Sequence, residues 1–139
     1  MVVVGILAVL MVIGIVNQSR SKSNRLLDGA AQEMTEALRF ARQSGMSFGG
    51  TTVTFTTTTN PAKYTITKTT GGQVLKVFTL PLDVTLTPGS GMSPLTFAAN
   101  GTSSAPSPSG TITVRSNNTG RTGTLTVLQT AGTTSVTIQ

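Results

Sequence analysis

Residues 25–42, RLLDGAAQEMTEALRFAR, decide the fold of this chain. Their apolar side chains recur every three to four positions, while most charged and amide side chains fall between them. This spacing predicts an amphipathic helix whose Ala/Leu stripe packs against another layer of structure. The packing residues we expect are Leu26, Leu27, Ala30, Met34, Leu38 and Ala41.

The preceding residues 1–16, MVVVGILAVLMVIGIV, carry no charge. Sixteen helical residues span about 24 Å, slightly less than the roughly 30 Å hydrocarbon core of a bilayer. A signal-peptide core and a buried helix of a soluble domain are alternatives. The signal peptide is not favoured, because no basic region precedes the run and no small-residue cleavage pattern follows it. We therefore expect a membrane anchor, with Arg20, Lys22 and Arg25 at the membrane face, where acidic headgroups attract them.

A single helix can join these two segments, because no proline occurs before Pro61. Ser44-Gly45 is the expected stop, so the helix is predicted to end near Gln43. The expected organisation is an apolar membrane or filament-core segment (1–18), an amphipathic continuation (19–45) and a Thr-rich β-domain (46–139).

After Gly49-Gly50 the apolar period changes to two, which is typical of half-buried strands. Thr70-Gly71-Gly72 predicts a hairpin turn between strands 63–69 and 73–79. Further strands are expected around 52–56, 84–87, 95–98, 111–115, 123–129 and 134–138. The predicted class is α+β: a long N-terminal α-helix packed on an antiparallel β-sheet or β-sandwich.

The composition argues against an enzyme. The chain has no cysteine and no histidine, which excludes disulfides, thiolate chemistry and His-based catalysis or metal binding. The four carboxylates, Asp28, Glu33, Glu36 and Asp83, show no catalytic or metal-binding spacing. We predict no catalytic residue, no metal and no cofactor.

The net charge is +6, which leaves one candidate recognition surface. We expect Arg115 and Arg121, together with Lys68 and Lys76 and with Lys63 nearby, to form a basic patch at the distal end of the β-domain. Such a patch would bind double-stranded DNA through its phosphates, in a salt-sensitive way.

The chain resembles type IV pilins and type II secretion pseudopilins, and within them the GspH/FimT-like group. The similar parts are the apolar run 1–16, the helix 25–42 and the C-terminal strands LTFAANG (95–101), GTITV (110–114) and GTLTVLQTAGTTSVTI (123–138). The resemblance implies a single-pass inner-membrane subunit that later joins a periplasmic or cell-surface filament. Its partners would be itself, other pilin-like subunits, the inner-membrane assembly machinery and membrane lipid, and pilin-type methylation is expected.

The resemblance also assigns the filament or membrane helix, whose expected contact residues are Val4, Gly5, Leu7, Ala8, Leu10, Ile13 and Gly14. Gly5 and Ala8 permit close helix packing. The chain departs from the group at its start, where the leader and the conserved Glu are missing, and we expect that the sequence begins about six residues inside the mature protein.

DNA-binding FimT-like pilins carry a Gly-Arg-x-Arg motif near the C-terminus. The corresponding turn here, residues 131–135, has no arginine, and Gly120-Arg121-Thr122-Gly123 keeps one. The favoured interpretation is therefore a structural subunit of a type IV pilus or type II secretion pseudopilus. A DNA-binding minor pilin acting in natural transformation is the alternative, and an adhesin or glycan-binding module is a weaker third.

Overall fold

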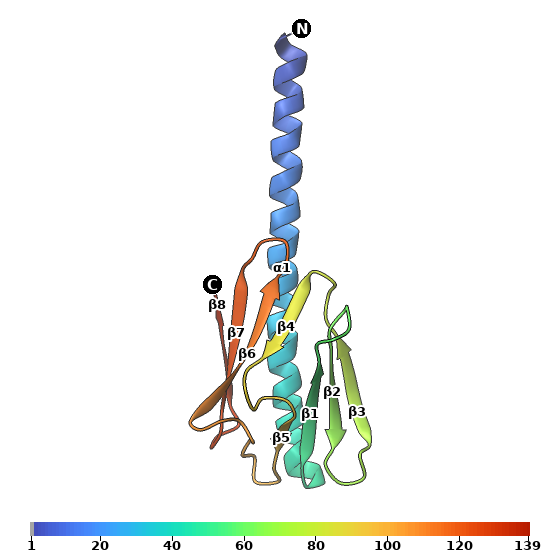
Figure 1. Cartoon of the computed structure of the whole chain (residues 1–139), viewed down its shortest axis with the longest axis vertical. Helices are drawn as coiled ribbons and strands as arrows, with labels where there is room; N and C mark the ends of the chain where they lie inside the picture. Colours follow the sequence, from blue (N-terminus) through green and yellow to red (C-terminus); the bar gives the residue numbers. More distant parts are fainter. Residues whose placement is uncertain (1) are drawn as a thin grey trace.

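One long helix and two small antiparallel sheets make up the fold (Figure 1). The structure is a computed structural model that describes helix α1 from Val2 and side chains from residue 20 to residue 139. The elements are α1 (Val2–Phe48), β1 (Thr51–Thr56), β2 (Lys63–Lys68), β3 (Val74–Thr79), β4 (Val84–Pro88), β5 (Leu95–Phe97), β6 (Ser109–Ser116), β7 (Thr122–Leu128) and β8 (Thr134–Ile138). The α+β class predicted from the sequence is confirmed.

Each sheet has four strands, in the orders β3-β2-β1-β5 and β4-β6-β7-β8. All described strand pairs are antiparallel. The sheets lie side by side along the C-terminal half of α1, and the helix contacts strands of both (Figure 1). The helix therefore forms a shared layer for two sheets, which in the described part of the chain have no strand-to-strand pairing with each other.

The predicted strands lie within one or two residues of their observed bounds, but the predicted helix end was wrong. The helix runs on through Gly45 to Phe48, and the chain turns at Gly49 and Gly50, which have φ angles of 81° and 134°. Positive φ is the conformation that glycine adopts at helix C-termini. Gly45 instead lies in a closely packed place, because a Cβ there would lie 3.1 Å from the carbonyl oxygen of Phe97.

The core lies between α1 and the inward faces of both sheets. Strand β1 shows how the alternation works, since Thr51, Val53 and Phe55 are buried and Thr54 is exposed. The largest fully buried side chains come from the helix and from both sheets: Leu27, Met34, Leu38, Val53, Ile66, Met92, Leu95, Phe97, Ile112, Val114, Leu125 and Val127. A Thr51 hydroxyl also donates to the carbonyl of Ala41 at 2.6 Å, which joins β1 to the helix.

The outward faces explain the high threonine content. Threonines directly opposite one another form cross-strand rows on each sheet, such as Thr96, Thr52 and Thr67 on one and Thr87, Thr113, Thr124 and Thr137 on the other. A β-branched side chain suits the pleated strand and its hydroxyl remains hydrated. The Thr-x-Thr pattern therefore marks strands with an apolar inner face and an uncharged polar outer face.

Two glycines within α1 should respond to alanine in opposite ways. A Cβ at Gly29 would meet nothing within 4 Å, so Gly29→Ala should raise the free energy of unfolding by about 0.5–1 kcal/mol through helix propensity alone. A Cβ at Gly45 would meet the Phe97 carbonyl, the Thr51 hydroxyl and the Phe97 Cβ at 3.1, 3.2 and 3.3 Å, so Gly45→Ala should lower it. Urea unfolding of the full chain in mild detergent, followed by fluorescence of its single tyrosine, measures both; equal stabilisation would contradict the close packing of β5 on the helix.

Candidate functional site

The first candidate surface is the seam between α1 and the sheets. Of the residues expected there, Leu27, Ala30, Met34, Leu38 and Ala41 are buried, whereas Leu26 is only half-buried. The seam also contains Ala31, Ala37, Ser23, Thr35 and Ser44. The polar members fit because short hydroxyls bond locally, as Thr35 does to the carbonyl of Ala31 at 2.9 Å.

The expected filament or membrane residues, Val4 to Gly14, lie outside the residues whose side chains are described. Between residues 20 and 139, no helix has the length and apolar character needed to cross a membrane.

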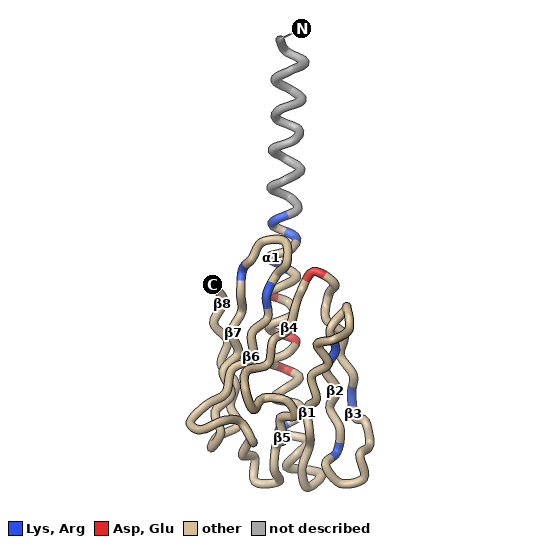
Figure 2. Tube along the Cα trace, viewed as in Figure 1, with Lys and Arg blue, Asp and Glu red and all other residues tan. Residues whose placement is uncertain are grey.

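The single basic patch expected at the distal end does not form. Arg115 and Arg121 flank the β6–β7 turn, whereas Lys68 and Lys76 lie on β2 and β3 of the other sheet (Figure 2). Lys68 Nζ lies 4.2 Å from the ring centre of Phe48, and Lys76 Nζ lies 4.5 Å from that of Phe78. The sequence places all four in strands or turns, but only the sheet order shows that the arginines and the lysines are separated.

The β6–β7 turn carries its two arginines to the end of the domain where α1 enters it (Figures 1 and 2). Asn118 in this turn donates from Nδ2 to the Ser23 hydroxyl at 3.3 Å. Arg121 Nη1 lies 4.0 Å from Asp28 Oδ1, and both side chains are well exposed, so this ion pair adds little stability. The contacts fix the turn against the helix seven residues beyond Val16.

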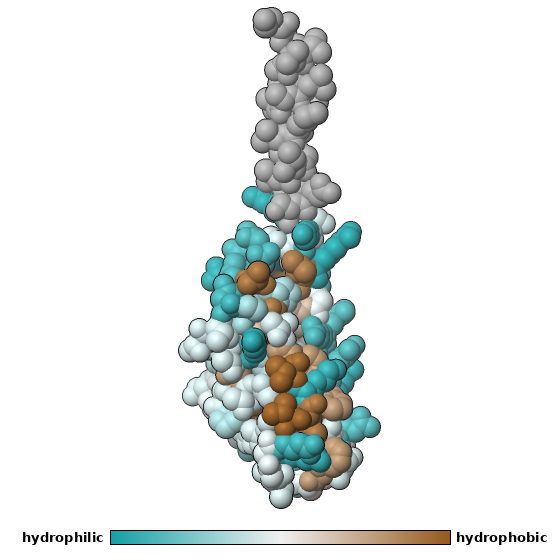
Figure 3. Space-filling model, turned by 90° about the vertical axis from the view of Figure 1, so that its right-hand side faces the viewer, coloured by the Kyte–Doolittle hydropathy of each residue, from teal (hydrophilic) through white to brown (hydrophobic). Residues whose placement is uncertain are grey.

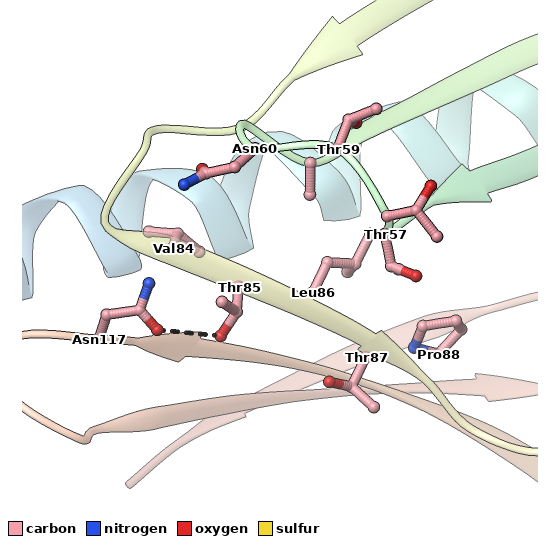
Figure 4. Close-up of a pocket in the computed structure, with 11 residues that line it drawn as sticks. Thr57, Thr59, Asn60, Val84, Thr85, Leu86, Thr87, Pro88 and Asn117 are labelled. Atoms are coloured by element: carbon pink, nitrogen blue, oxygen red, sulfur yellow. Dashed lines mark hydrogen bonds between the residues drawn. The ribbon is translucent and has the colours of Figure 1, made fainter.

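A groove of about 660 Å³ opens between strand β4 and the loop 57–60 (Figure 4). Thr57, Thr59 and Asn60 face Val84, Leu86 and Pro88 across it, and Thr85 donates a 3.4 Å hydrogen bond to the Asn117 side chain. Its lining is made of threonine, asparagine and small apolar side chains, none of them charged. The groove can hold an uncharged polar segment, but its lining supplies no general acid, base or anion-binding group.

Arg42 connects the helix to two distal loops, one after β5 and one between β7 and β8. Its Nε donates to the carbonyl of Gly101 at 3.1 Å, and a Cβ on Gly132 would lie 3.2 Å from Arg42 Cδ. Together with Arg39 and Met46, it lines a pocket of about 390 Å³ against residues 132–134. Sequence reasoning assigned Arg42 no contact, because it follows the apolar stripe and its partners lie in loops far away in the sequence.

Some apolar side chains remain exposed. In the described part of the chain they come mainly from the end of α1 (Phe40, Met46 and Phe48) and from edge strand β3 (Val74 and Val77). Figure 3 shows apolar patches spread along one side of the domain between hydrophilic groups. Separated patches of this kind suit contacts with neighbouring chains better than a single enclosed ligand site.

Among residues 20–139, Tyr64 has a strongly shifted pKa. It stacks on Phe78, with ring centres 4.8 Å apart, and its hydroxyl has no hydrogen-bond partner among the described residues. Burial raises the pKa of Tyr64 far above its usual value, and the charge of Glu33 raises it further. Within residues 20–139, no three acidic side chains come together where they could hold a metal ion.

Two solved structures share this fold. The minor pseudopilin EpsH from the type 2 secretion system of Vibrio cholerae superposes with a TM-score of 0.63 at 15% identity, over 81% of this chain and 96% of that one. The type IV minor pilin FimU of Pseudomonas aeruginosa superposes with a TM-score of 0.64 at 22% identity, over 84% of this chain and 90% of that one. The fold is thus that of a pilin-like subunit.

The sequence makes the assignment narrower. Residues 30–132 match the family described as type II transport protein GspH, and the chain belongs to that family. No curated protein matches the sequence significantly. Pilins and pseudopilins are structural subunits, so this protein is a structural subunit and not an enzyme.

Alkaline titration should reveal the burial of Tyr64. Because its folded pKa lies above the unfolded value of about 10, the protonated form stabilises the fold below pH 10, and this contribution is lost as the pH rises further. Tyrosinate absorbance should therefore appear together with loss of structure, and Tyr64→Phe should resist alkaline unfolding better. The chain has one tyrosine and no tryptophan, so near-ultraviolet absorbance and circular dichroism follow both events. Ionisation near pH 10 in a still-folded chain would contradict the burial.

Proposed function

We propose that this protein is a minor pilin or pseudopilin that assembles into a periplasmic or cell-surface filament through its apolar N-terminal helix. The family assignment supports a pilin-like subunit, and the finer proposal rests on the way that α1 is used. Among residues 20–139, burial of the helix against the sheets begins at Ser23. The charge-free run 1–16 belongs to the same helix but comes before that seam.

The helix is long enough for two tasks. Its 47 residues correspond to about 70 Å, and the seam from Ser23 to Gly45 takes about 33 Å of this length. The remaining segment contains the proposed contact residues Val4, Gly5, Leu7, Ala8, Leu10, Ile13 and Gly14. We assign it to the inner membrane before assembly and to the filament core afterwards, with the assembly machinery moving it between the two.

The proposed partners are other copies of this chain and other pilin-like subunits. Inside a membrane, burial of apolar surface does not drive helices together, because lipid tails are equally apolar. Small residues in the apolar run, such as Gly5 and Ala8, let helices approach closely and gain packing contacts there. The exposed apolar side chains of β3 and of the end of α1 would contact neighbouring domains. Pilin-type methylation of the mature N-terminus is part of the same proposal.

A charge within the apolar run should prevent assembly. A lysine near the centre of a membrane helix costs about 2.5–3.5 kcal/mol, so Leu10→Lys should reduce the filament fraction by roughly a hundredfold. Gln32→Lys is the matched control, because Gln32 is exposed on the outer face of the same helix. Both variants are produced in bacteria with an assembly system, and sheared filaments are quantified by immunoblot and electron microscopy. Normal filaments from Leu10→Lys would overturn the proposal.

Binding of double-stranded DNA is the alternative function. Of the four side chains expected to contact it, Arg115 and Arg121 lie near each other, whereas Lys68 and Lys76 lie on paired strands of the other sheet. We expect the full chain in detergent to bind DNA only non-specifically, with a Kd of about 10⁻⁴–10⁻⁶ M that weakens steeply with salt. Gel-shift titration measures this, and Arg115→Ala and Arg121→Ala should each weaken the binding. Submicromolar binding at physiological salt would favour the DNA-binding alternative.

A further inference from the structure

We propose that the end of the domain where α1 enters binds anionic lipid headgroups through a ring of basic side chains. The ring, called here the basic collar, consists of Arg20, Lys22, Arg25, Arg115 and Arg121. This inference rests on the proposed membrane function and adds the chemistry of the lipid that the domain contacts.

The collar is assembled from two distant parts of the sequence. Each residue turns the helix by about 100°, so Arg25 lies about 140° and Lys22 about 200° around from Arg20. Ser23, at about 300°, points into the remaining gap, where its hydroxyl bonds Asn118 of the β6–β7 turn. Arg115 and Arg121 flank this turn, so they supply positive charge on the side of the helix that its own basic residues leave open (Figure 2).

The height of the collar matches a headgroup layer. Val16 ends the apolar run, and Ser23 follows seven residues later, which is about 10 Å along the helix. The headgroup region adds roughly 5–7 Å to each side of the hydrocarbon core. If the apolar run ends at the edge of the hydrocarbon, Arg20 lies about 6 Å out, within the headgroup layer. Lys22 and the β6–β7 turn lie about 9–10 Å out, just beyond this layer, where a long basic side chain can reach back to the phosphates.

The acidic residues at this end do not cancel the collar. Asp28 Oδ1 lies 4.0 Å from Arg121 Nη1. Asp83 lies beside the β6–β7 turn, because its backbone carbonyl accepts a 2.8 Å hydrogen bond from the backbone amide of Asn117. Five basic groups therefore face two acidic ones, while Lys68 and Lys76 lie over aromatic rings on the other sheet. The excess of positive charge sits at the end that adjoins the apolar run.

The shape of the collar favours a membrane over DNA. A ring around a helix presents all its charges to a plane that the helix crosses, whereas a rod-shaped duplex would contact only an arc of it. Each Lys or Arg near an anionic bilayer surface adds attraction that decays within a Debye length of about 10 Å at 0.1 M salt. The five groups lie at different heights along the axis, and their long side chains can reach toward the same bilayer surface from every side of the helix.

The test follows the distance between the domain and the bilayer in the full chain. The chain has no cysteine, so Leu82→Cys places a single fluorophore on an exposed residue in the β3–β4 turn, outside the collar. The labelled chain is reconstituted into phosphatidylcholine vesicles with or without about 30% phosphatidylglycerol. Energy transfer to a headgroup-attached acceptor reports the ratio of docked to free domain.

We expect more transfer in the anionic vesicles and a loss of the difference in 0.5 M salt. Arg115→Gln with Arg121→Gln should lower the docked-to-free ratio by roughly tenfold or more. Lys68→Gln with Lys76→Gln removes the same charge from the other sheet and should leave the ratio unchanged. Circular dichroism confirms that both double variants are folded.

Equal transfer in both lipids, or equal loss in both double variants, overturns the collar. So does a gel shift in which the arginine pair governs DNA binding while lipid charge has no effect. Flotation separates the collar from the membrane anchor of the proposed function. A chain that floats with neutral vesicles but shows no effect of anionic lipid is anchored without a collar. A chain that floats only with anionic vesicles keeps the collar and loses the anchor, and one that floats with neither loses both.

Discussion

Burial of the Ala/Leu stripe of α1 is the interaction on which the structure depends. Each sheet has four short strands and an apolar inner face, which must be buried against another layer of structure. The helix supplies the missing layer to both, with Leu27, Met34 and Leu38 fully buried between them. The alanines in the stripe keep the helix close to the strands, and Gly45 lets the shortest strand, β5, touch the helix backbone.

Periodicity in the sequence was enough to predict the class, the strands and the helix stripe. A 3.6-residue repeat over 26–41 and Thr-x-Thr alternation from residue 51 onward leave little room for other elements. The helix end was misplaced because Ser44-Gly45 satisfies the local rule for a stop, whereas the glycine is there for contact with Phe97. Local propensity cannot distinguish these two uses of glycine, since the second depends on a strand fifty residues away.

The functional surfaces were harder to predict for the same reason. The charge count identified the basic residues, but their grouping depends on sheet order and on where each turn meets the helix. Arg121 was expected near Lys68, yet it lies beside Asp28, because the β6–β7 hairpin runs back toward the start of the seam. The first and last parts of the sequence thus combine at one end of the domain, and a linear pattern contains no signal for this.

A single helix shared by two otherwise separate sheets has a mechanical consequence. A pull on the N-terminal end of α1 acts parallel to the seam, so all the contacts from Leu27 to Ala41 are loaded together, in shear. Each sheet has its own contacts with the loaded helix, and Ser103 joins the two sheets by pairing with Phe97 of β5 and donating to the carbonyl of Leu128 in β7. Arg42 adds a polar link near the far end. Such a domain resists extension along the helix axis better than force across it, which would open one sheet at a time.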